Sequence, residues 1–107
     1  MTRGDIISVS LPRDYGKPRP ALVIQSDLFS YLHSVTVLPL TSEILQAEAC
    51  RVTIEASQEN GLRKQSQVMV DKASSLPRSE AGPVIGHLSA TEMAAVNRAL
   101  ALFLGFA

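Results

Sequence analysis

One stretch constrains the fold of this chain more than any other: the segment 17–27, which reads Lys-Pro-Arg-Pro-Ala-Leu-Val-Ile-Gln-Ser-Asp. Its apolar run is short and contains β-branched residues, which indicates a buried strand rather than a helix. Proline lacks an amide hydrogen, so Pro20 suits the first residue of such a strand but not its centre. The pattern therefore places Arg19 at the mouth of a core strand, where a rigid backbone can aim its guanidinium group. A simpler interpretation, an exposed arginine beside a turn, fits these residues as well.

Alternation of apolar and polar residues predicts further short strands. The clearest is 50–55, where Cys50 and every second residue after it should face inward, with Arg51 and its alternates facing outward. Pro39, near the end of another predicted strand, indicates a sheet edge or a bulge there. The remaining predicted strands are 5–11 with Ile7, Val9 and Leu11 inward, 34–40, 66–71 with Val68 and Val70 inward, and a short one around 84–86.

The most regular pattern lies near the C-terminal end, and it predicts an amphipathic helix. Ser89 and Glu92 have the spacing of a capping box, in which each side chain accepts a hydrogen bond from the other residue's backbone N–H. Gly105 suits the position just after the helix. Apolar residues between these ends form one stripe, at Met93, Val96, Leu100, Phe103 and Leu104.

Several strands followed by one helix predict an α+β fold. We expect a small, strongly curved antiparallel sheet, or partly open barrel, that a C-terminal α-helix closes. At 107 residues the chain has the length of one domain, so a single domain over 1–107 is expected.

Composition limits the classes of function. Ten basic and ten acidic residues cancel, so a nucleic-acid partner requires a local positive surface rather than an overall charge. His33 and His87 are too few and too isolated for a metal cluster, and the sequence has no Gly-rich phosphate loop or Gly-x-Ser-x-Gly elbow, so no metal and no cofactor are expected. Cys50, the only cysteine, is expected to be a small core residue. No signal peptide pattern or membrane-spanning run is present, so a cytoplasmic location without membrane contact is expected.

Polar residues at the predicted strand ends are the candidates for a functional site. Arg19 opens one strand, Thr41 and Ser42 follow the next, and Asp71 and Lys72 close a later one. If the first two strands are antiparallel neighbours, Arg19 and Thr41 face one another across the rim of the sheet. A guanidinium fork and a hydroxyl that converge on one point suit a phosphate group. An alternative role for the Thr-Ser pair is to cap a helix directly after it.

Taken together, these segments resemble the MazF/PemK family, the toxin halves of bacterial toxin–antitoxin pairs. The matching segments run in order almost from end to end: 3–6, 19–27, 37–42, 61–62, 68–72, 85–89 and the C-terminal amphipathic helix. The Arg-Pro strand and the Pro-x-Thr-Ser segment are the most specific of them.

The resemblance implies an SH3-like, CcdB/PemK-like fold that works as a homodimer. It also implies a ribosome-independent, sequence-specific endoribonuclease that cuts single-stranded mRNA. A cognate MazE-like antitoxin is expected to inhibit it, and operator DNA is expected as a partner only together with that antitoxin. Cleavage of RNA without metal uses the ribose 2′-hydroxyl as nucleophile, and it leaves a 2′,3′-cyclic phosphate and a 5′-hydroxyl.

The resemblance also assigns roles to residues. Arg19 and Thr41 fall on the family's two catalytic positions. Asp71 falls where members carry an acidic residue, and Lys72 falls where many carry a glutamine that contacts RNA. The residues expected to bind substrate are Lys17, Ser42, Asp71 and Lys72.

Two segments depart from the family pattern. The first loop, 12–18, is shorter than in most members and lacks their acidic-amide pair, and 71–74 departs from the common Glu/Asp-Gln-Ile/Val-Arg sequence. Both departures concern RNA contacts, and neither touches Arg19 or Thr41. Two other functions share this fold: a CcdB-like poison of DNA gyrase, which the hydrophobic C-terminal end keeps open, and a non-catalytic barrel that binds RNA or a protein.

Overall fold

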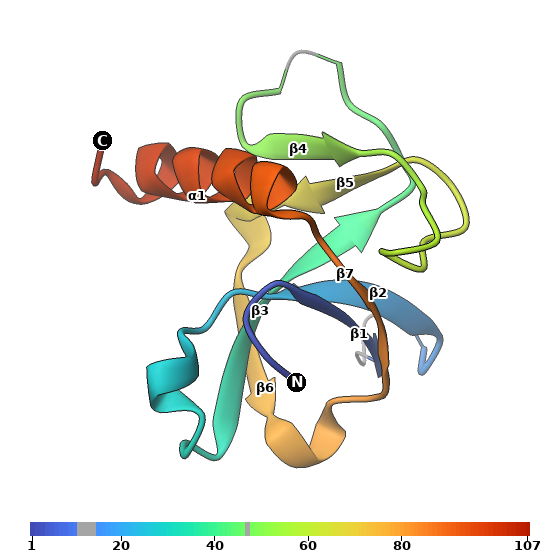
Figure 1. Ribbon diagram of the computed structural model, residues 1–107, viewed down its shortest axis with the longest axis vertical. Coiled ribbons are helices and arrows are strands. Elements are labelled where there is room, and N and C mark those ends of the chain that lie inside the picture. Colours follow the sequence, from blue (N-terminus) through green and yellow to red (C-terminus); the bar gives the residue numbers. More distant parts are fainter. Residues whose placement is uncertain (11–14, 47) are drawn as a thin grey trace.

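The computed structural model describes residues 1–10, 15–46 and 48–107 (Figure 1). Its strands are β1 (Asp5–Ser10), β2 (Pro18–Val23), β3 (Ser34–Thr41), β4 (Arg51–Ile54), β5 (Ser66–Met69), β6 (Ser74–Pro77) and β7 (Val84–His87). Short 3₁₀ helices lie between strands, namely η2 (Asp27–Phe29), η3 (Val70–Lys72) and η4 (Arg78–Glu80). One α-helix, α1 (Ala90–Leu104), follows the last strand, so the predicted α+β class is confirmed.

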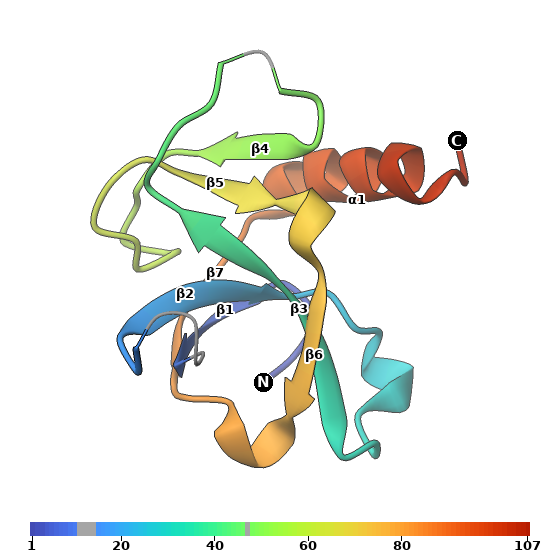
Figure 2. The ribbon, with the colours of Figure 1, turned by 180° about the vertical axis from the view of Figure 1, so that it is seen from behind.

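β3 is the strand around which the sheet curls. The strand order is β4-β5-β3-β2-β1-β7, with every neighbouring pair antiparallel, and β6 also pairs with β3. The first half of β3 pairs with β6, whereas Leu40 near its end lies opposite Val68 of β5. Pro39 was predicted to mark a sheet edge or a bulge. It stands inside the sheet at this change of partner, so the first alternative, a sheet edge, is wrong. Figure 1 and, from behind, Figure 2 show the curled sheet with α1 beside β4 and β5.

The sheet is apolar on both faces along β1, β2 and β3. Successive residues of a strand point to opposite faces, so Ile6 enters one core while Ile7 and Val9 enter a second. Val96 of α1 closes the first core, and β6 covers the second. β1 was predicted to bury one face only, and this is wrong at Ile6, which is buried on the other face. Leu11, also expected to face inward, lies outside the described residues.

The predicted boundaries of α1 are confirmed. The Glu92 N–H donates to Ser89 Oγ at 3.1 Å, and the Ser89 N–H donates to Glu92 Oε1 at 2.9 Å. Gly105 has a φ of 85°, the left-handed conformation that ends many helices. The predicted apolar stripe packs only over its first part, because Val96 is buried whereas Phe103 remains 51% exposed. Within the described residues, no helix combines the length and apolar character needed to cross a membrane.

Three local predictions differ from the structure. β5 ends at Met69 rather than at residue 71, because Val70 begins η3. β6 was missed because Leu76 is its one buried residue, which leaves no alternating pattern. Arg51 was expected to face solvent, yet its side chain is only 11% exposed because it pairs with Asp71.

Cys50 precedes β4 and is half-buried, so it is not the core residue that was expected. Partial burial, the hydrogen bond from Sγ to Glu48 Oε1 and the nearby charge of Asp71 raise the pKa of the thiol. A raised pKa keeps the thiol protonated at neutral pH, which makes it a poor nucleophile.

Candidate functional site

A groove of about 980 Å³ lies at the ends of β2 and β3. Five of the six residues predicted to form a site line it: Lys17, Arg19, Thr41, Ser42 and Lys72. They come from the start of β2, the end of β3 and the end of η3, so only the folded sheet brings them together.

Arg19 and Thr41 stand at the same end of two paired strands. β2 and β3 are antiparallel neighbours, which meets the condition under which the sequence brings Arg19 and Thr41 together, and Ala21 lies opposite Pro39. Arg19 is two residues before Ala21, and Thr41 is two residues after Pro39. Because the strands run in opposite directions, both residues lie at the same end of the strand pair. Both residues also line the groove, so a residue with a guanidinium and one with a hydroxyl lie at the same end of this strand pair.

The Thr41 hydroxyl is held by a local turn. Its Oγ1 accepts a hydrogen bond from the Glu43 N–H at 3.1 Å. No helix follows among the described residues 43–46 and 48–49, so the alternative role of a helix cap is wrong. A hydroxyl that accepts one hydrogen bond keeps its own proton to donate. The turn therefore fixes the oxygen at the groove in a state that suits donation to a phosphate.

Asp71, the sixth predicted residue, is not among the described residues that line the groove. Its Oδ1 accepts a hydrogen bond from Arg51 Nε at 3.1 Å, and its Oδ2 lies 3.9 Å from Lys72 Nζ. Partial burial alone raises the pKa of Asp71, but the Arg51 hydrogen bond, a backbone hydrogen bond and the charges of Arg51 and Lys72 outweigh it and lower the pKa from its ordinary 3.8. Asp71 thus pairs with Arg51 and Lys72 beside the groove, and its role in substrate binding stays a prediction.

This pairing predicts the stability of an Asp71→Asn variant. The free energy of unfolding should fall by about 1–3 kcal/mol at neutral pH, because the partly buried guanidinium of Arg51 loses its charged partner. Since the folded pKa is lowered, the carboxylate's contribution is fully present above the unfolded pKa, near 3.8, and is lost as pH falls through the folded pKa. Urea unfolding should therefore give a higher free energy of unfolding for the wild type than for Asp71→Asn at neutral pH, and this difference should disappear in acid. A difference in free energy of unfolding that is unchanged in acid would contradict the pairing of Asp71 with Arg51.

Two basic residues of the site were missed from the sequence. Arg63 and Lys64 line the groove from the turn between β4 and β5. The turn is ordered by buried Asn60, whose Oδ1 accepts hydrogen bonds from the Ser57 and Leu62 N–H groups, both at 3.0 Å. The signal available was a pair of cations directly after an Asn-Gly turn, but nothing local indicated that the turn folds back to the sheet.

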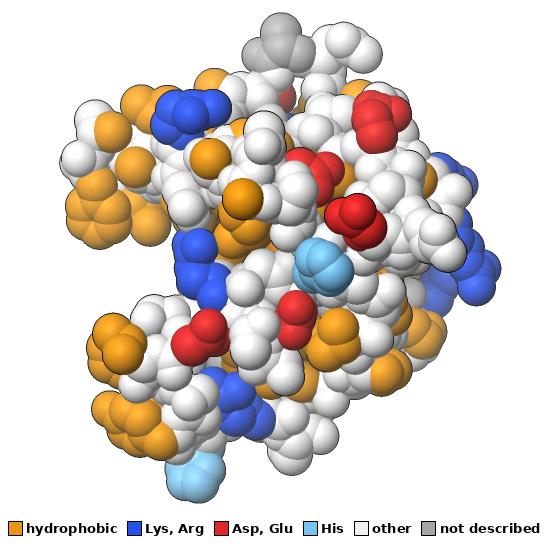
Figure 3. All heavy atoms as spheres, viewed as in Figure 1, with side chains coloured by type: hydrophobic (Ala, Val, Ile, Leu, Met, Phe, Trp, Pro, Cys, Tyr) orange, Lys and Arg blue, Asp and Glu red, His pale blue; other side chains and the backbone are white. Residues whose placement is uncertain are grey.

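The groove is locally positive although the chain has no net charge. Among its described lining residues, five are Lys or Arg and one, Glu43, is acidic. Figure 3 shows basic side chains gathered on the right of the molecule, where Figure 1 places the turn between β4 and β5. The local positive surface that a nucleic-acid partner requires is therefore present. Across residues 1–10, 15–46 and 48–107, no three His, Cys, Asp or Glu side chains group closely enough to hold a metal ion.

Comparison with known proteins identifies the family. Residues 2–104 match the model of the PemK-like, MazF-like toxins of type II toxin–antitoxin systems. A probable endoribonuclease MazF of Mycolicibacterium smegmatis is 43% identical over 108 residues, which cover 100% of this chain and 99% of that protein.

Solved structures agree with this match. The Mycobacterium tuberculosis toxin MazF-mt6 aligns with a TM-score of 0.81 at 28% identity, over 94% of this chain and 96% of that one. A MazE–MazF structure from Deinococcus radiodurans aligns with a TM-score of 0.79 at 25% identity, over 98% of this chain and 95% of that one. The match to one family's model over almost the whole chain also decides against the CcdB-like alternative. The chain belongs to the family of PemK-like, MazF-like toxins of type II toxin–antitoxin systems.

Proposed function

We propose that this chain is an endoribonuclease toxin that binds single-stranded mRNA in the groove and cuts it at a short sequence. The observation that carries the proposal is the meeting of Arg19 and Thr41, from adjacent strands, in a groove whose other charged residues are mostly basic. A family relative named as a probable endoribonuclease, 43% identical, supports it. Residues 1–107 are proposed to act as one toxin domain.

The proposed reaction is attack of the ribose 2′-hydroxyl on the adjacent phosphorus. The bond from phosphorus to the 2′-oxygen forms as the bond to the 5′-oxygen breaks, the 2′-hydroxyl releases its proton to water, and the 5′-oxygen takes up a proton to leave as a hydroxyl. Negative charge gathers on the non-bridging oxygens as the phosphorus becomes five-coordinate. The Arg19 guanidinium donates to those oxygens, and donors placed where charge develops commonly contribute about 3–4 kcal/mol. The Thr41 hydroxyl, held by the Glu43 N–H, donates a second hydrogen bond and keeps the phosphate in line.

The other groove cations bind the chain of phosphates on either side of the cut. Lys17, Lys72, Arg63 and Lys64 lie along the groove, and Ser42 adds a hydroxyl beside Thr41. Contacts to phosphates position a nucleic acid without reading its sequence. These residues therefore supply affinity and register, while base recognition falls to other contacts.

Cleavage of a defined single-stranded RNA, with its DNA counterpart as control, tests this function. The RNA should be cut in buffer containing EDTA, and the DNA should remain intact because it has no 2′-hydroxyl. Chemical mapping of the product ends should find 2′,3′-cyclic phosphates and 5′-hydroxyls. Products with 5′-phosphates, or loss of activity with EDTA, would contradict the proposed chemistry, and an intact RNA would favour the non-catalytic barrel.

The proposed antitoxin partner is a MazE-like protein with an acidic, disordered segment. Such a segment pairs with the basic lining of the groove and blocks RNA, because both ligands require the same cations. Operator DNA is proposed as a partner only of the toxin–antitoxin complex. A solved MazE–MazF structure, 25% identical in its matched chain, supports the choice of partner.

We also propose that the working form is a homodimer. Apolar side chains stay exposed at the end of α1, where Phe103 and Leu102 are 51% and 62% exposed, and around η2, where Leu28 is 82% exposed. Figure 3 shows hydrophobic side chains over both regions on the left of the molecule. A two-fold interface buries one such surface twice. Sedimentation at micromolar concentration tests this, and a stable monomer would contradict it.

A further inference from the structure

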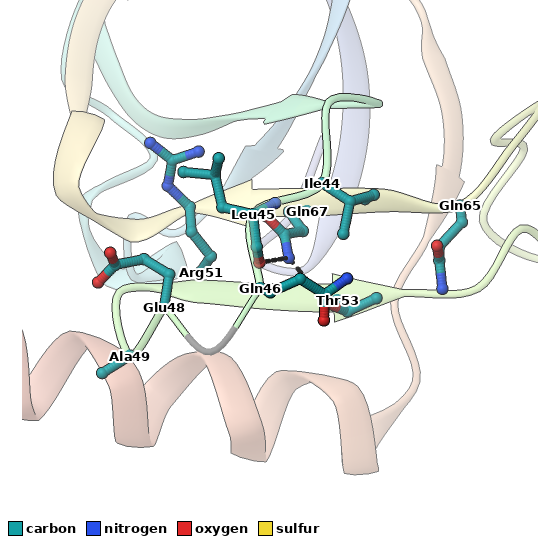
Figure 4. Close-up of a pocket in the computed structure, with 9 residues that line it drawn as sticks. All are labelled: Ile44, Leu45, Gln46, Glu48, Ala49, Arg51, Thr53, Gln65 and Gln67. Carbon is teal, nitrogen blue, oxygen red and sulfur yellow. Dashed lines mark hydrogen bonds between the residues drawn. The ribbon is translucent and has the colours of Figure 1, made fainter.

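Buried Gln67 binds the backbone of the segment that follows Thr41. Gln67 is only 3% exposed, and its side-chain amide makes three hydrogen bonds (Figure 4). Oε1 accepts from the Leu45 N–H at 3.0 Å, while Nε2 donates to the Leu45 carbonyl at 2.9 Å and to Thr53 Oγ1 at 3.1 Å. One side chain thus satisfies both polar groups of a loop residue, as a neighbouring strand would.

The place of Gln67 in the sheet makes this contact matter for the groove. Gln67 lies opposite Thr41 on one side and opposite Thr53 on the other, because β5 runs between β3 and β4. Gln67 lines a pocket of about 450 Å³ together with Ile44, Leu45 and Thr53, and Figure 4 shows its amide between Leu45 and Thr53.

The segment 41–45 is therefore fixed at two points. The Thr41 hydroxyl binds the Glu43 N–H at one end, and the Gln67 amide binds both polar groups of Leu45 at the other. Between these points lie Ser42 and Glu43, which line the groove. Without Gln67, Leu45 loses both of these backbone hydrogen bonds. The turn that holds Thr41 then becomes free to change conformation.

We propose that Gln67 is a positioning residue for RNA cleavage, which acts through the 41–45 segment to hold the Thr41 hydroxyl in line with the scissile phosphate. This inference rests on the proposed function of the groove. Its physical basis is that a displacement of about 1 Å at a reacting centre can cost a hundredfold in rate. Gln67 does not line the groove, so its loss should lower kcat while leaving KM nearly unchanged.

The test compares Gln67→Met with Gln65→Met in the full-length protein. Both variants replace an amide by a thioether of similar length. Gln67 lies in β5, and Gln65 directly precedes that strand. Among residues 1–10, 15–46 and 48–107, the side chain of Gln65 bonds only exposed Glu55, with Nε2 donating to Oε2 at 2.6 Å. Gln67→Met should lower kcat on a defined RNA by about ten- to a hundredfold, whereas Gln65→Met should match the wild type. Hydrogen exchange at the Leu45 amide should rise in Gln67→Met alone, while amides of β1 and β2 keep their protection.

Coupling to Thr41 separates positioning from general loss of stability. If Gln67 acts through Thr41, then Gln67→Met should cost little further rate in a Thr41→Val background, because the positioned hydroxyl is already absent. The inference is overturned if the double variant loses kcat by the product of the two single-variant factors. It is also overturned if Gln67→Met keeps the wild-type kcat. Should Gln67→Met fold poorly, Gln67→Asn serves in its place, because it keeps an uncharged amide but is one methylene too short to reach Leu45 as Gln67 does.

The outcomes also distinguish this inference from the function on which it rests. If the wild type cleaves RNA and Arg19→Ala does not, a fully active Gln67→Met defeats the positioning role alone. If the wild type cleaves no RNA, the proposed function fails and the inference fails with it.

Discussion

Replacement of Arg19 by alanine should slow RNA cleavage by about a hundredfold to a thousandfold, the usual loss for a donor aimed at developing charge. The residue lies at the exposed start of β2, so its removal opens no cavity in either core. Thermal unfolding should therefore change little. The measurement is the single-turnover rate on a defined single-stranded RNA at saturating enzyme, which reports the chemical step rather than binding.

Two further variants sharpen that result. Arg98→Ala removes an exposed arginine from α1, which does not contribute to the described lining of the groove, and should cleave at the wild-type rate. Arg19→Lys keeps a positive charge but loses the planar pair of donors, so it should recover only part of the activity. An Arg19→Ala protein that cuts RNA at the wild-type rate would remove Arg19 from the catalytic site.

Gly86→Ala should produce the largest loss of stability of any variant considered. A Cβ on Gly86 would lie 2.3 Å from the carbonyl carbon and 2.4 Å from the oxygen of Asn60, which are backbone atoms that no side-chain rotation can move away. The expected cost is about 3 kcal/mol, at the upper end of the range for overpacking. In a domain of this size the midpoint of thermal unfolding should fall by roughly 10 °C or more.

A matched glycine separates this steric effect from backbone strain. Gly105 has a φ of 85°, but a Cβ there would meet nothing within 4 Å. Gly105→Ala should therefore cost only the strain of a left-handed alanine, about 1 kcal/mol. Gly86→Ala should also reduce RNA affinity, because the turn that packs on β7 carries Arg63 and Lys64 to the groove. Equal unfolding midpoints for the two variants would contradict the close packing of Asn60 on Gly86.

The parts of the fold that follow from local patterns were predictable from the sequence. The capping box at Ser89 and Glu92 and the apolar runs of β2 and β3 are signals within a few residues, and the structure contains all three elements. The nearness of Arg19 and Thr41 followed from the sequence only on the condition that β2 and β3 are antiparallel neighbours, which they are. Family resemblance strengthened that pairing, although the roles of both residues stay predictions.

The parts that were missed depend on contacts between distant segments. Arg51 looks like an outward residue of an alternating strand, and only η3 brings Asp71 to it. Gln67 likewise sits in a polar stretch with no special pattern, and its burial depends on the 44–46 loop folding over β5. Arg63 and Lys64 reach the groove because two glycines allow their turn to pack against β7. None of these contacts leaves a periodic trace in the sequence.

The most direct test of the account is cleavage of one RNA that lacks a single 2′-hydroxyl. The wild-type protein is first used to locate a cut in an RNA oligonucleotide, in the presence of EDTA. The oligonucleotide is then made again with a 2′-deoxy nucleotide on the 5′ side of that bond and is otherwise unchanged. The account predicts that this bond remains intact while the modified RNA still competes for binding. Cleavage of the modified bond at the original rate would contradict attack by the 2′-hydroxyl, and with it the proposed reaction.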